Sequence, residues 1–471
     1  MPDLKLFNTE TRQKEVFVSK EKKCVKLYTC GPTIYDYAHI GNFRTYIFED
    51  LLRRTLKYFG FSVYQVMNLT DVDDKTIQGA VTNQVSLESY TKPFKEAFFS
   101  DFKRLQIEPA EKYPAATEHI AEMIEMIEIL LKKGFAYRGQ DGGVYFSIQK
   151  CPRYGRLSHL KLDELKTNAL NRTFSDEYEK DQASDFVLWK AYDETRDGSV
   201  FWESPFGKGR PGWHIECSAM ALKHLGSEID IHCGGVDNLF PHHENEIAQS
   251  ECATDQLFVR YWLHSEHLLV NNQKMSKSKG NFYTLRDLLE KGYTGREVRY
   301  LLLATHYKTQ LNFTLEGLVA ARSSLKRIDD FILRLQDVED FHSSHEALAL
   351  IQKVKNHFKE ALADDLNISL AIAALFDFLR EINTLIDQKS LSKQEAKHVI
   401  ETLKEFNQVL EIMEFQREEV MIPEDVQKAL LIREKARSEK NWAEADIQRD
   451  YIFQKGYRII DTPSGARVTK K

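Results

Sequence analysis

The chain has 471 residues, of which 42% are hydrophobic and 29% charged, and its formal net charge is −6 at pH 7. This length and apolar content suffice for several packed domains, and no stretch is long and apolar enough to cross a membrane. The negative charge excludes a uniformly basic nucleic-acid-binding protein. Because the sequence has no apolar N-terminal leader and no Cys-x-x-Cys pair among its six cysteines, we expect reduced thiols, no disulfide framework and a cytoplasmic protein.

Residues 25 to about 125 alternate between strand and helix patterns, which predicts the first half of a doubly wound parallel sheet. A first strand ends at Cys30, and His39-Ile40-Gly41-Asn42 then opens a helix closed by Gly60. One face of this helix is apolar, with Phe43, Ile47, Leu51, Leu52, Leu56 and Phe59. A helix N-terminus presents unpaired N–H groups to an anion, so His39, Gly41 and Asn42 are predicted to bind phosphate. Taken alone, this segment is more often an ordinary helix cap.

An aromatic and glycine-rich stretch from Gly134 through Pro205 interrupts the sheet. It contains three short strand-like segments, Phe135-Ala136-Tyr137, Gly142-Gly143-Val144-Tyr145-Phe146 and Phe186-Val187-Leu188-Trp189. Short strands separated by loops indicate an inserted subdomain rather than a continuation of the parallel sheet. We expect the sheet to resume near Gly212 and to run to about Val270.

The second half of the sheet carries residues that can bind a metal ion. A helix that begins after Gly212 places Trp213 and Cys217 on one face, and the next helix places His242 and Glu246 four residues apart. Between them, an alternating strand from 228 to 235 ends at two glycines and delivers Asp237 to the crevice at the carboxyl edge of the sheet. An acidic residue in this position can accept hydrogen bonds from ribose hydroxyls.

Cys30 lies at the same predicted edge, so Cys30, Cys217, His242 and Glu246 could bind one metal ion together. They offer two sulfurs, one nitrogen and one oxygen, a donor set that suits zinc. No spacing rule identifies this set. The local pattern also allows His242 to be a capping or surface residue and Glu246 to lie on a solvated helix face.

A polar loop, Lys274-Met275-Ser276-Lys277-Ser278, follows the apolar segment Leu268-Leu269-Val270. Its two lysines and two serines are too polar for a core, although such loops are often only solvated turns. With the helix N-terminus at Gly41, it would form a split site for a polyphosphate. This combination favours adenylyl transfer.

Helical patterns dominate the chain after about residue 318. From Leu431 onward there are ten Lys or Arg residues against six Asp or Glu. This basic tail is a candidate RNA-binding segment, in which Trp442 could stack on a base. A charged helical hairpin, with Trp442 filling a minor core, is an equally good interpretation of the same residues.

The two motifs resemble the signatures of the class I aminoacyl-tRNA synthetases. The lysine and serine loop matches letter for letter, whereas Asn42 stands where the family has a second histidine. The resemblance extends to the cysteinyl-tRNA synthetase family through Asn68-Leu69-Thr70-Asp71-Val72-Asp73-Asp74-Lys75 and a C-terminal Ala443-Glu444-Ala445-Asp446 segment. Cys233 is a further departure, since the family has glycine there, and we expect its thiol either to pack or to lie close to the metal.

This resemblance implies that the chain activates L-cysteine with ATP, releases pyrophosphate and transfers cysteine to the 3′ end of tRNA(Cys). It implies one Zn²⁺ ion on Cys30, Cys217, His242 and Glu246, substrate contacts from Thr70 and Trp213, and Mg²⁺ bound with the ATP. His39, Asn42, Lys274 and Lys277 would be catalytic, and His39, Gly41, Asp237 and Lys277 would bind ATP. Because two thiolates and a carboxylate exceed the charge of the ion, we expect Glu246 to be the weakest ligand.

The expected architecture is an α/β fold, with a doubly wound, Rossmann-type catalytic domain, an inserted subdomain, an α-helical bundle and a small C-terminal domain. The expected ranges are 1–125 and 211–270 for the catalytic halves, 126–210 for the insertion, 271–318 for the stem-contact region, 319–415 for the bundle and 416–471 for the anticodon-binding domain. We expect a monomer. Two alternatives remain, a cysteine ligase that uses a small amine acceptor and a non-catalytic zinc- or RNA-binding relative.

Overall fold

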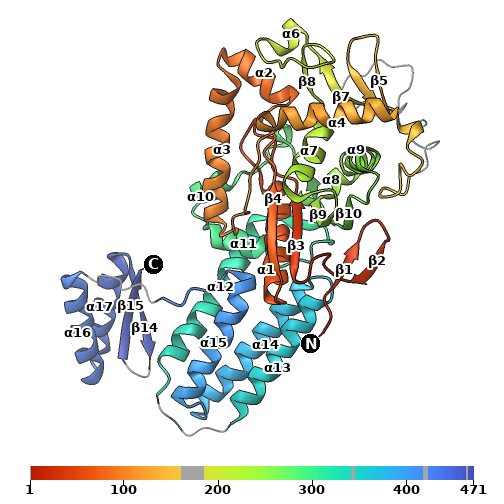
Figure 1. The fold of residues 1–471 in the computed structure, drawn as a ribbon. Coiled ribbons are helices and arrows are strands. Elements are labelled where there is room, and N and C mark those ends of the chain that lie inside the picture. Colours follow the sequence, from red (N-terminus) through yellow and green to blue (C-terminus); the bar gives the residue numbers. More distant parts are fainter. Residues whose placement is uncertain are drawn as a thin grey trace.

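The computed structural model describes residues 2–160, 185–339, 341, 345–416, 423–462 and 465–470. Its central feature is a four-stranded parallel sheet with strand order β10-β9-β3-β4 (Figure 1). The strands are β3 (Cys24–Thr29), β4 (Ser62–Met67), β9 (Ile229–Gly235) and β10 (Val259–Ser265). Strand order reverses between β3 and β9, so the predicted doubly wound sheet is confirmed and its switch point lies between these two strands.

Helices cover both faces of the sheet because its strands are apolar on both sides. Helix α1 (Ile40–Tyr58) packs on one face in a core that includes Leu27, Ile231 and Cys233. On the other face a second core contains Tyr28, Cys30 and Cys217 and is covered by three helices, α4 (Ile120–Lys133), α7 (Trp213–Leu225) and α9 (Glu244–Thr254). Alternate residues of one strand therefore enter different cores, as the period of two requires.

Helices α2 (Asp74–Asn83) and α3 (Leu87–Arg104) follow β4, and the insertion follows α4 as an antiparallel sheet of order β5-β6-β7-β8. Its strands are β5 (Ala136–Arg138), β6 (Val144–Phe146), β7 (Phe186–Ala191) and β8 (Gly209–Pro211). The three predicted strand-like segments are all represented, and β8 runs directly into α7. A hairpin of β1 (Lys5–Asn8) and β2 (Gln13–Val16) lies beside β10, where the Thr9 N–H donates to the Trp262 carbonyl at 2.8 Å.

The lysine and serine loop belongs to a small sheet of order β12-β11-β13, formed by β11 (Leu268–Val270), β12 (Gln273–Lys274) and β13 (Leu311–Phe313). Helices α10 (Leu285–Glu290) and α11 (Gly295–Leu303) connect the loop to β13. The helical bundle that follows consists of α12 (Leu315–Gln336), α13 (Glu346–Ala363), α14 (Ile368–Asp387) and α15 (Lys393–Leu410). Its first helix continues the core beneath α1.

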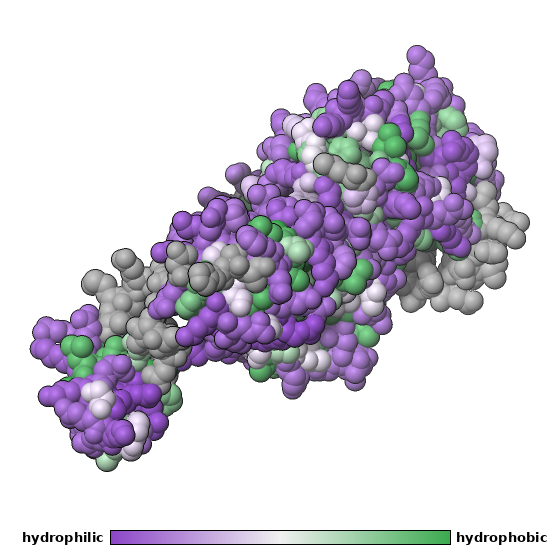
Figure 2. Space-filling view, turned by 90° about the horizontal axis from the view of Figure 1, so that it is seen from below, coloured by the Kyte–Doolittle hydropathy of each residue, from purple (hydrophilic) through white to green (hydrophobic). Residues whose placement is uncertain are grey.

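The C-terminal segment forms a separate small unit with its own core of Val426, Ala429, Ile452, Tyr457 and Val468. Helices α16 (Glu424–Ser438) and α17 (Trp442–Gln454) pair with a hairpin of β14 (Tyr457–Thr462) and β15 (Gly465–Lys470) that the helical pattern did not predict. Trp442 is 59% exposed, so it does not fill this core. The unit lies at one end of an elongated molecule, whose face in Figure 2 is largely hydrophilic.

Among the helices of the described residues, none combines the length and the apolar character that crossing a membrane requires.

Arg299 of α11 joins the parallel-sheet domain to the bundle from a fully buried position. Its guanidinium donates to the Asp50 carboxylate at 2.6 Å, to the Leu410 carbonyl at 2.9 Å and to the Leu105 carbonyl at 3.0 Å. Burial would raise the pKa of Asp50, but the cationic Arg299 and Arg54 hold it below its usual range. These contacts tie α1, α3 and α15 to one side chain.

Replacing Arg299 with alanine should lower the free energy of unfolding by about 3 kcal/mol, because the Asp50 carboxylate would stay buried without its main partner. Lys326→Ala is a matched control, since it removes the exposed ion pair with Asp330 and should cost less than about 1 kcal/mol. Urea unfolding followed by circular dichroism measures both changes. Equal midpoints for the two variants would show that Arg299 does not join the domains in this way.

Candidate functional site

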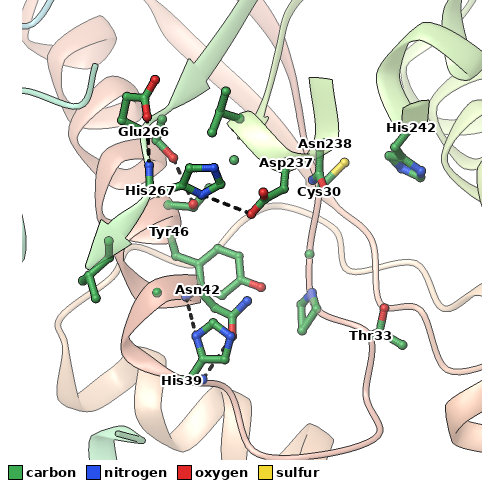
Figure 3. Close-up of a pocket in the computed structure, with 18 of the residues that line it drawn as sticks. Cys30, Thr33, His39, Asn42, Tyr46, Asp237, Asn238, His242, Glu266 and His267 are labelled. Carbon is green, nitrogen blue, oxygen red and sulfur yellow. Dashed lines mark hydrogen bonds and ion pairs between the residues drawn. The ribbon is translucent and has the colours of Figure 1, made fainter. Parts of the chain in front are cut away.

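A cavity of about 520 Å³ opens at the carboxyl ends of β3, β9 and β10 (Figure 3). Ten of the twelve residues predicted from the sequence line it: Cys30, His39, Gly41, Asn42, Thr70, Trp213, Cys217, Asp237, His242 and Lys274. The two exceptions are Glu246, which is buried behind the cavity wall, and Lys277, which is turned toward Asp36. The structure therefore gathers side chains that are up to 244 positions apart in the chain into one site, at the switch point where α/β sheets bind ligands.

His39 is the N-cap of α1, and it forms a reciprocal pair with Asn42. The His39 Nδ1 accepts from the Asn42 N–H at 3.2 Å, and the Asn42 Oδ1 accepts from the His39 N–H at 3.0 Å (Figure 3). Burial lowers the pKa of His39 to about 4, so the ring is neutral at pH 7. Since Nδ1 is an acceptor, the ring proton is on Nε2, and this N–H and the Asn42 Nδ2 remain as donors for a ligand.

Position 41 must be glycine because two other side chains approach its backbone too closely to leave room for a Cβ atom. A Cβ at this position would lie 2.9 Å from the His39 ring and 3.3 Å from the Met275 methyl group. The first contact is shorter than side chains tolerate. The absence of a side chain thus leaves the first turn of α1 open to the cavity, where backbone N–H groups can meet an anion.

The lysine and serine loop closes one side of the cavity through Lys274 and Met275. The Ser276 N–H donates to the Asn281 Oδ1 at 2.8 Å, and the Asn281 amide donates to the Lys274 carbonyl at 3.3 Å. These bonds hold the loop in a compact turn. Lys277 points out of the cavity, so only one of the two predicted phosphate-binding lysines reaches it in this structure.

Asp237 follows β9 and lines the cavity. Its side chain is 75% exposed, and its Oδ2 lies 3.4 Å from the His267 Nδ1 (Figure 3). His267 also lines the cavity but was not predicted. The carboxylate is thus accessible to hydroxyl donors and is oriented by a neighbouring imidazole.

The four predicted metal ligands converge at the inner end of the cavity. The donor atoms of Cys30, Cys217, His242 and Glu246 all lie within 4.8 Å of one another, and all four residues are buried. The His242 Nε2 and the Glu246 Oε1 are 3.0 Å apart, yet this oxygen has no hydrogen-bond partner among the described residues. These two atoms form an ion pair, and donor atoms gathered this closely in a buried site fit a set directed at a common ion.

The charges of this cluster also favour a cation. A hydrogen bond from Cys30 lowers the pKa of the Cys217 thiol to about 6. Burial alone would lower the pKa of His242, but the negative charges of Cys217 and Glu246 raise it to about 10. The site therefore stabilises a positive charge at its centre, and it supplies the deprotonated sulfur that zinc requires.

Four further histidines support this cluster and were not predicted. His214 contacts the His242 Nδ1 at 2.9 Å through its own Nδ1, and the His232 Nε2 lies 3.0 Å from the Glu246 Oε2. Such outer contacts orient metal ligands. The His243 Nδ1 lies 2.8 Å from the His264 Nε2, while its Nε2 lies 3.3 Å from the Cys30 Sγ.

A second possible donor set consists of Cys30, His232, His243 and Glu246. It shares Cys30 and Glu246 with the predicted set, so the two sets describe one possible metal centre. Together they offer more imidazole groups than a four-coordinate zinc ion needs. The alternating pattern of 228–235 predicted a strand that ends at the crevice, but nothing in the sequence paired His232 with Glu246. Its partner is set by tertiary packing alone.

Three other residues singled out in the sequence are Cys233, Trp213 and Thr70. Cys233 enters the core on the α1 face of the sheet, whereas Cys30 and Cys217 lie in the core on the other face. Its thiol therefore packs and belongs to neither donor set. Trp213 is 37% exposed and stacks on His242 with ring centroids 4.2 Å apart, so simple core packing does not describe it. Thr70 is buried and accepts from the Asn68 amide at 3.1 Å.

Comparison with known proteins connects this geometry to a family. Residues 16–323 match the model of the class I (C) tRNA synthetase catalytic domain, and residues 357–414 match the DALR domain. The chain is 58% identical to the cysteine–tRNA ligase of Protochlamydia amoebophila over 468 residues, covering 99% of this chain and 98% of the relative. It is 56% identical to that of Chlamydia caviae, with the same coverage, and 56% identical to that of Chlamydia muridarum, covering 99% and 100% of the two chains.

Solved structures share the fold at much lower identity. Mycobacterium tuberculosis methionyl-tRNA synthetase in complex with methionyl-adenylate superimposes with a TM-score of 0.61 at 14% identity, covering 90% of this chain and 96% of that one. The sequence relatives and the domain models together identify the chain: it belongs to the cysteine–tRNA ligase family of class I aminoacyl-tRNA synthetases.

Proposed function

We propose that this protein activates L-cysteine with ATP to form cysteinyl-adenylate and pyrophosphate, and then transfers cysteine to the 3′ end of tRNA(Cys). One observation carries the proposal: a single cavity joins an anion-binding helix N-terminus to a buried cluster of thiols and imidazoles. The first suits the triphosphate, and the second suits the sulfur of the amino acid.

The first reaction needs positioning and charge stabilisation rather than a protein nucleophile. The cysteine carboxylate attacks the α-phosphorus and pyrophosphate leaves, so negative charge moves onto the leaving oxygens. The Nε2–H of His39, the Nδ2–H of Asn42 and the first N–H groups of α1 would hold these oxygens from one side, and Lys274 and Lys277 from the other. Asp237 would accept from the ribose hydroxyls. Mg²⁺ would enter with the ATP.

At the other end of the cavity, Cys30, Cys217, His242 and Glu246 would hold a zinc ion, with Trp213 and Thr70 beside the substrate. When bound, zinc supplies a soft acceptor for the thiolate of cysteine, to which a serine hydroxyl binds far more weakly. An apolar pocket alone distinguishes so small a change by only about 1–3 kcal/mol. Glu246 would be the weakest ligand because the donor set already exceeds the charge of the ion, and His232 could hold its carboxylate if it withdrew.

For tRNA we propose contacts at two places along the chain. Residues 271–318 would contact the acceptor stem next to the cavity, and residues 416–471 would read the anticodon at the far end of the molecule. The exposed Trp442 in the basic tail supports this second role. We further infer a monomer and a cytoplasmic location, and the six free cysteines support the second of these inferences.

Cysteine-dependent exchange of labelled pyrophosphate into ATP tests the first reaction, and charging of purified tRNA(Cys) tests the second. Exchange without charging would favour a ligase with a small amine acceptor. Loss of both reactions in zinc-loaded protein would favour a non-catalytic relative.

Changing Cys217 to serine should reduce zinc affinity more than about 100-fold and remove the preference for cysteine over serine, because a hydroxyl is a poor zinc ligand at neutral pH. Elemental analysis after dialysis measures the zinc, and pyrophosphate exchange measures the preference. Cys151→Ser is the matched control, since Cys151 is also buried but lies outside both donor sets. Unchanged zinc content in the Cys217 variant would refute the assignment.

Two substitutions of Asn42 separate its capping role from its role toward ATP. Asn42→Asp keeps the acceptor for the His39 N–H but replaces a donor with a negative charge, so it should reduce kcat/KM for ATP by about 10²–10³-fold with little change in stability. Asn42→Ala loses the reciprocal bond and should lower the free energy of unfolding by about 0.5–1 kcal/mol. Full activity of the aspartate variant would mean that Asn42 only caps the helix.

A further inference from the structure

Lys277 forms an ion pair with Asp36, a residue that the site described above does not use. The Lys277 ammonium donates to the Asp36 Oδ2, and it also lies over the Phe282 ring at 5.1 Å from the centroid. Phe282 in turn contacts the His39 ring edge-on, with centroids 5.3 Å apart. Asp36 therefore connects the loop that precedes α1 to the lysine and serine loop.

The two partners are held with different rigidity. The Asp36 Oδ1 accepts from the Tyr37 N–H at 2.8 Å, which fixes the carboxylate relative to its own backbone. The adjacent Tyr35 carbonyl accepts from the Tyr90 hydroxyl at 3.0 Å, so this loop is fastened to α3. Lys277 instead extends from a short turn, and its side chain is 65% exposed. If the pair separates, Lys277 is the partner that moves.

The Lys277–Asp36 ion pair lies outside the cavity but close to residues that line it. Lys274 and Met275 line the cavity, whereas Lys277 and Asp36 do not. Under the proposed function, Lys277 must reach the leaving phosphates, so its bond to Asp36 has to break first. An exposed ion pair contributes little net free energy, while a triphosphate offers several charged oxygens to the same ammonium. ATP can therefore displace the carboxylate.

We propose that Asp36 is a positioning residue that holds Lys277 away from the cavity in the nucleotide-free enzyme and releases it to the triphosphate when ATP binds. This inference rests on the proposed function, because it assigns the ligand that takes Lys277. Asp36 acts through Lys277 and touches no reacting atom. The bond keeps the loop in one resting conformation, and nucleotide binding shifts the population to the closed one.

The test is Asp36→Asn, which keeps an acceptor for the Tyr37 N–H but removes the charge that holds Lys277. We expect the Kd of ATP, measured without cysteine, to fall by about two- to fivefold, because the nucleotide no longer competes with the carboxylate. The KM for cysteine should not change. Hydrogen exchange of residues 274–281 should be faster than in the unchanged protein without ATP and equal to it with ATP.

A double-mutant cycle shows whether the effect passes through Lys277. In a Lys277→Ala background, Asp36→Asn should leave the Kd of ATP unchanged. Asp330→Asn is the matched control, since it removes the similarly exposed pair with Lys326 in α12, outside the cavity, and should leave ATP binding unchanged.

Two results would overturn the inference. A higher Kd for ATP in Asp36→Asn would mean that the carboxylate binds the nucleotide or its Mg²⁺. An equal decrease in the Lys277→Ala background would mean that Asp36 acts independently of Lys277. Failure of the proposed function gives a different result, because the unchanged protein would then show no cysteine-dependent pyrophosphate exchange, whatever its affinity for ATP.

Discussion

The parallel pairing of β3 with β9 is the constraint on which the site depends. Tyr28 is in register with His232 and Thr29 with Cys233, although about two hundred residues separate the two strands in the chain. Because both strands end at the same edge, Cys30 leaves β3 where β9 passes into the Asp237 turn. Helices α1 and α9 then start from this edge, so the phosphate-binding residues and the metal ligands face one cavity. A one-residue shift of β3 in this register would turn Tyr28 toward the α1 core and away from His232.

Burial of charge at the inner end of the cavity is costly unless the charges compensate one another. Glu246 is fully buried, which by itself would raise its pKa, but its contacts with His232 and His242 lower that pKa to about 2. The surrounding histidines supply directed contacts without adding fixed charge, since burial holds the pKa values of His214 and His243 well below the ordinary value. A neutral imidazole shell around an anionic centre suits a divalent ion better than a shell of lysines or arginines would.

Much of this arrangement could be predicted from the sequence because strand ends and helix starts are local properties. The alternation ending at Gly235, the spacing of His242 and Glu246 and the apolar face of α1 placed each residue on the correct element. The partners of His232 and His243 could not be predicted, because periodicity reports which face a residue occupies and not which side chain it meets there. The contact of Lys277 with Asp36 was missed for the same reason, since it joins two exposed loops. The β14 and β15 hairpin was not predicted, because the helical pattern of the preceding segment does not show where helix gives way to strand.

The two ends of the cavity differ in how firmly their residues are held, and this difference follows from what each end must do. Around the thiols, every proposed ligand is at most 7% exposed and several are fixed by outer histidines. A site that distinguishes sulfur from oxygen depends on donor geometry, so rigidity there preserves selectivity. At the phosphate end, Lys277 is held by one exposed ion pair. A group that must bind the triphosphate and then release pyrophosphate needs a weak resting contact, because a buried pair would cost too much to break at every turnover.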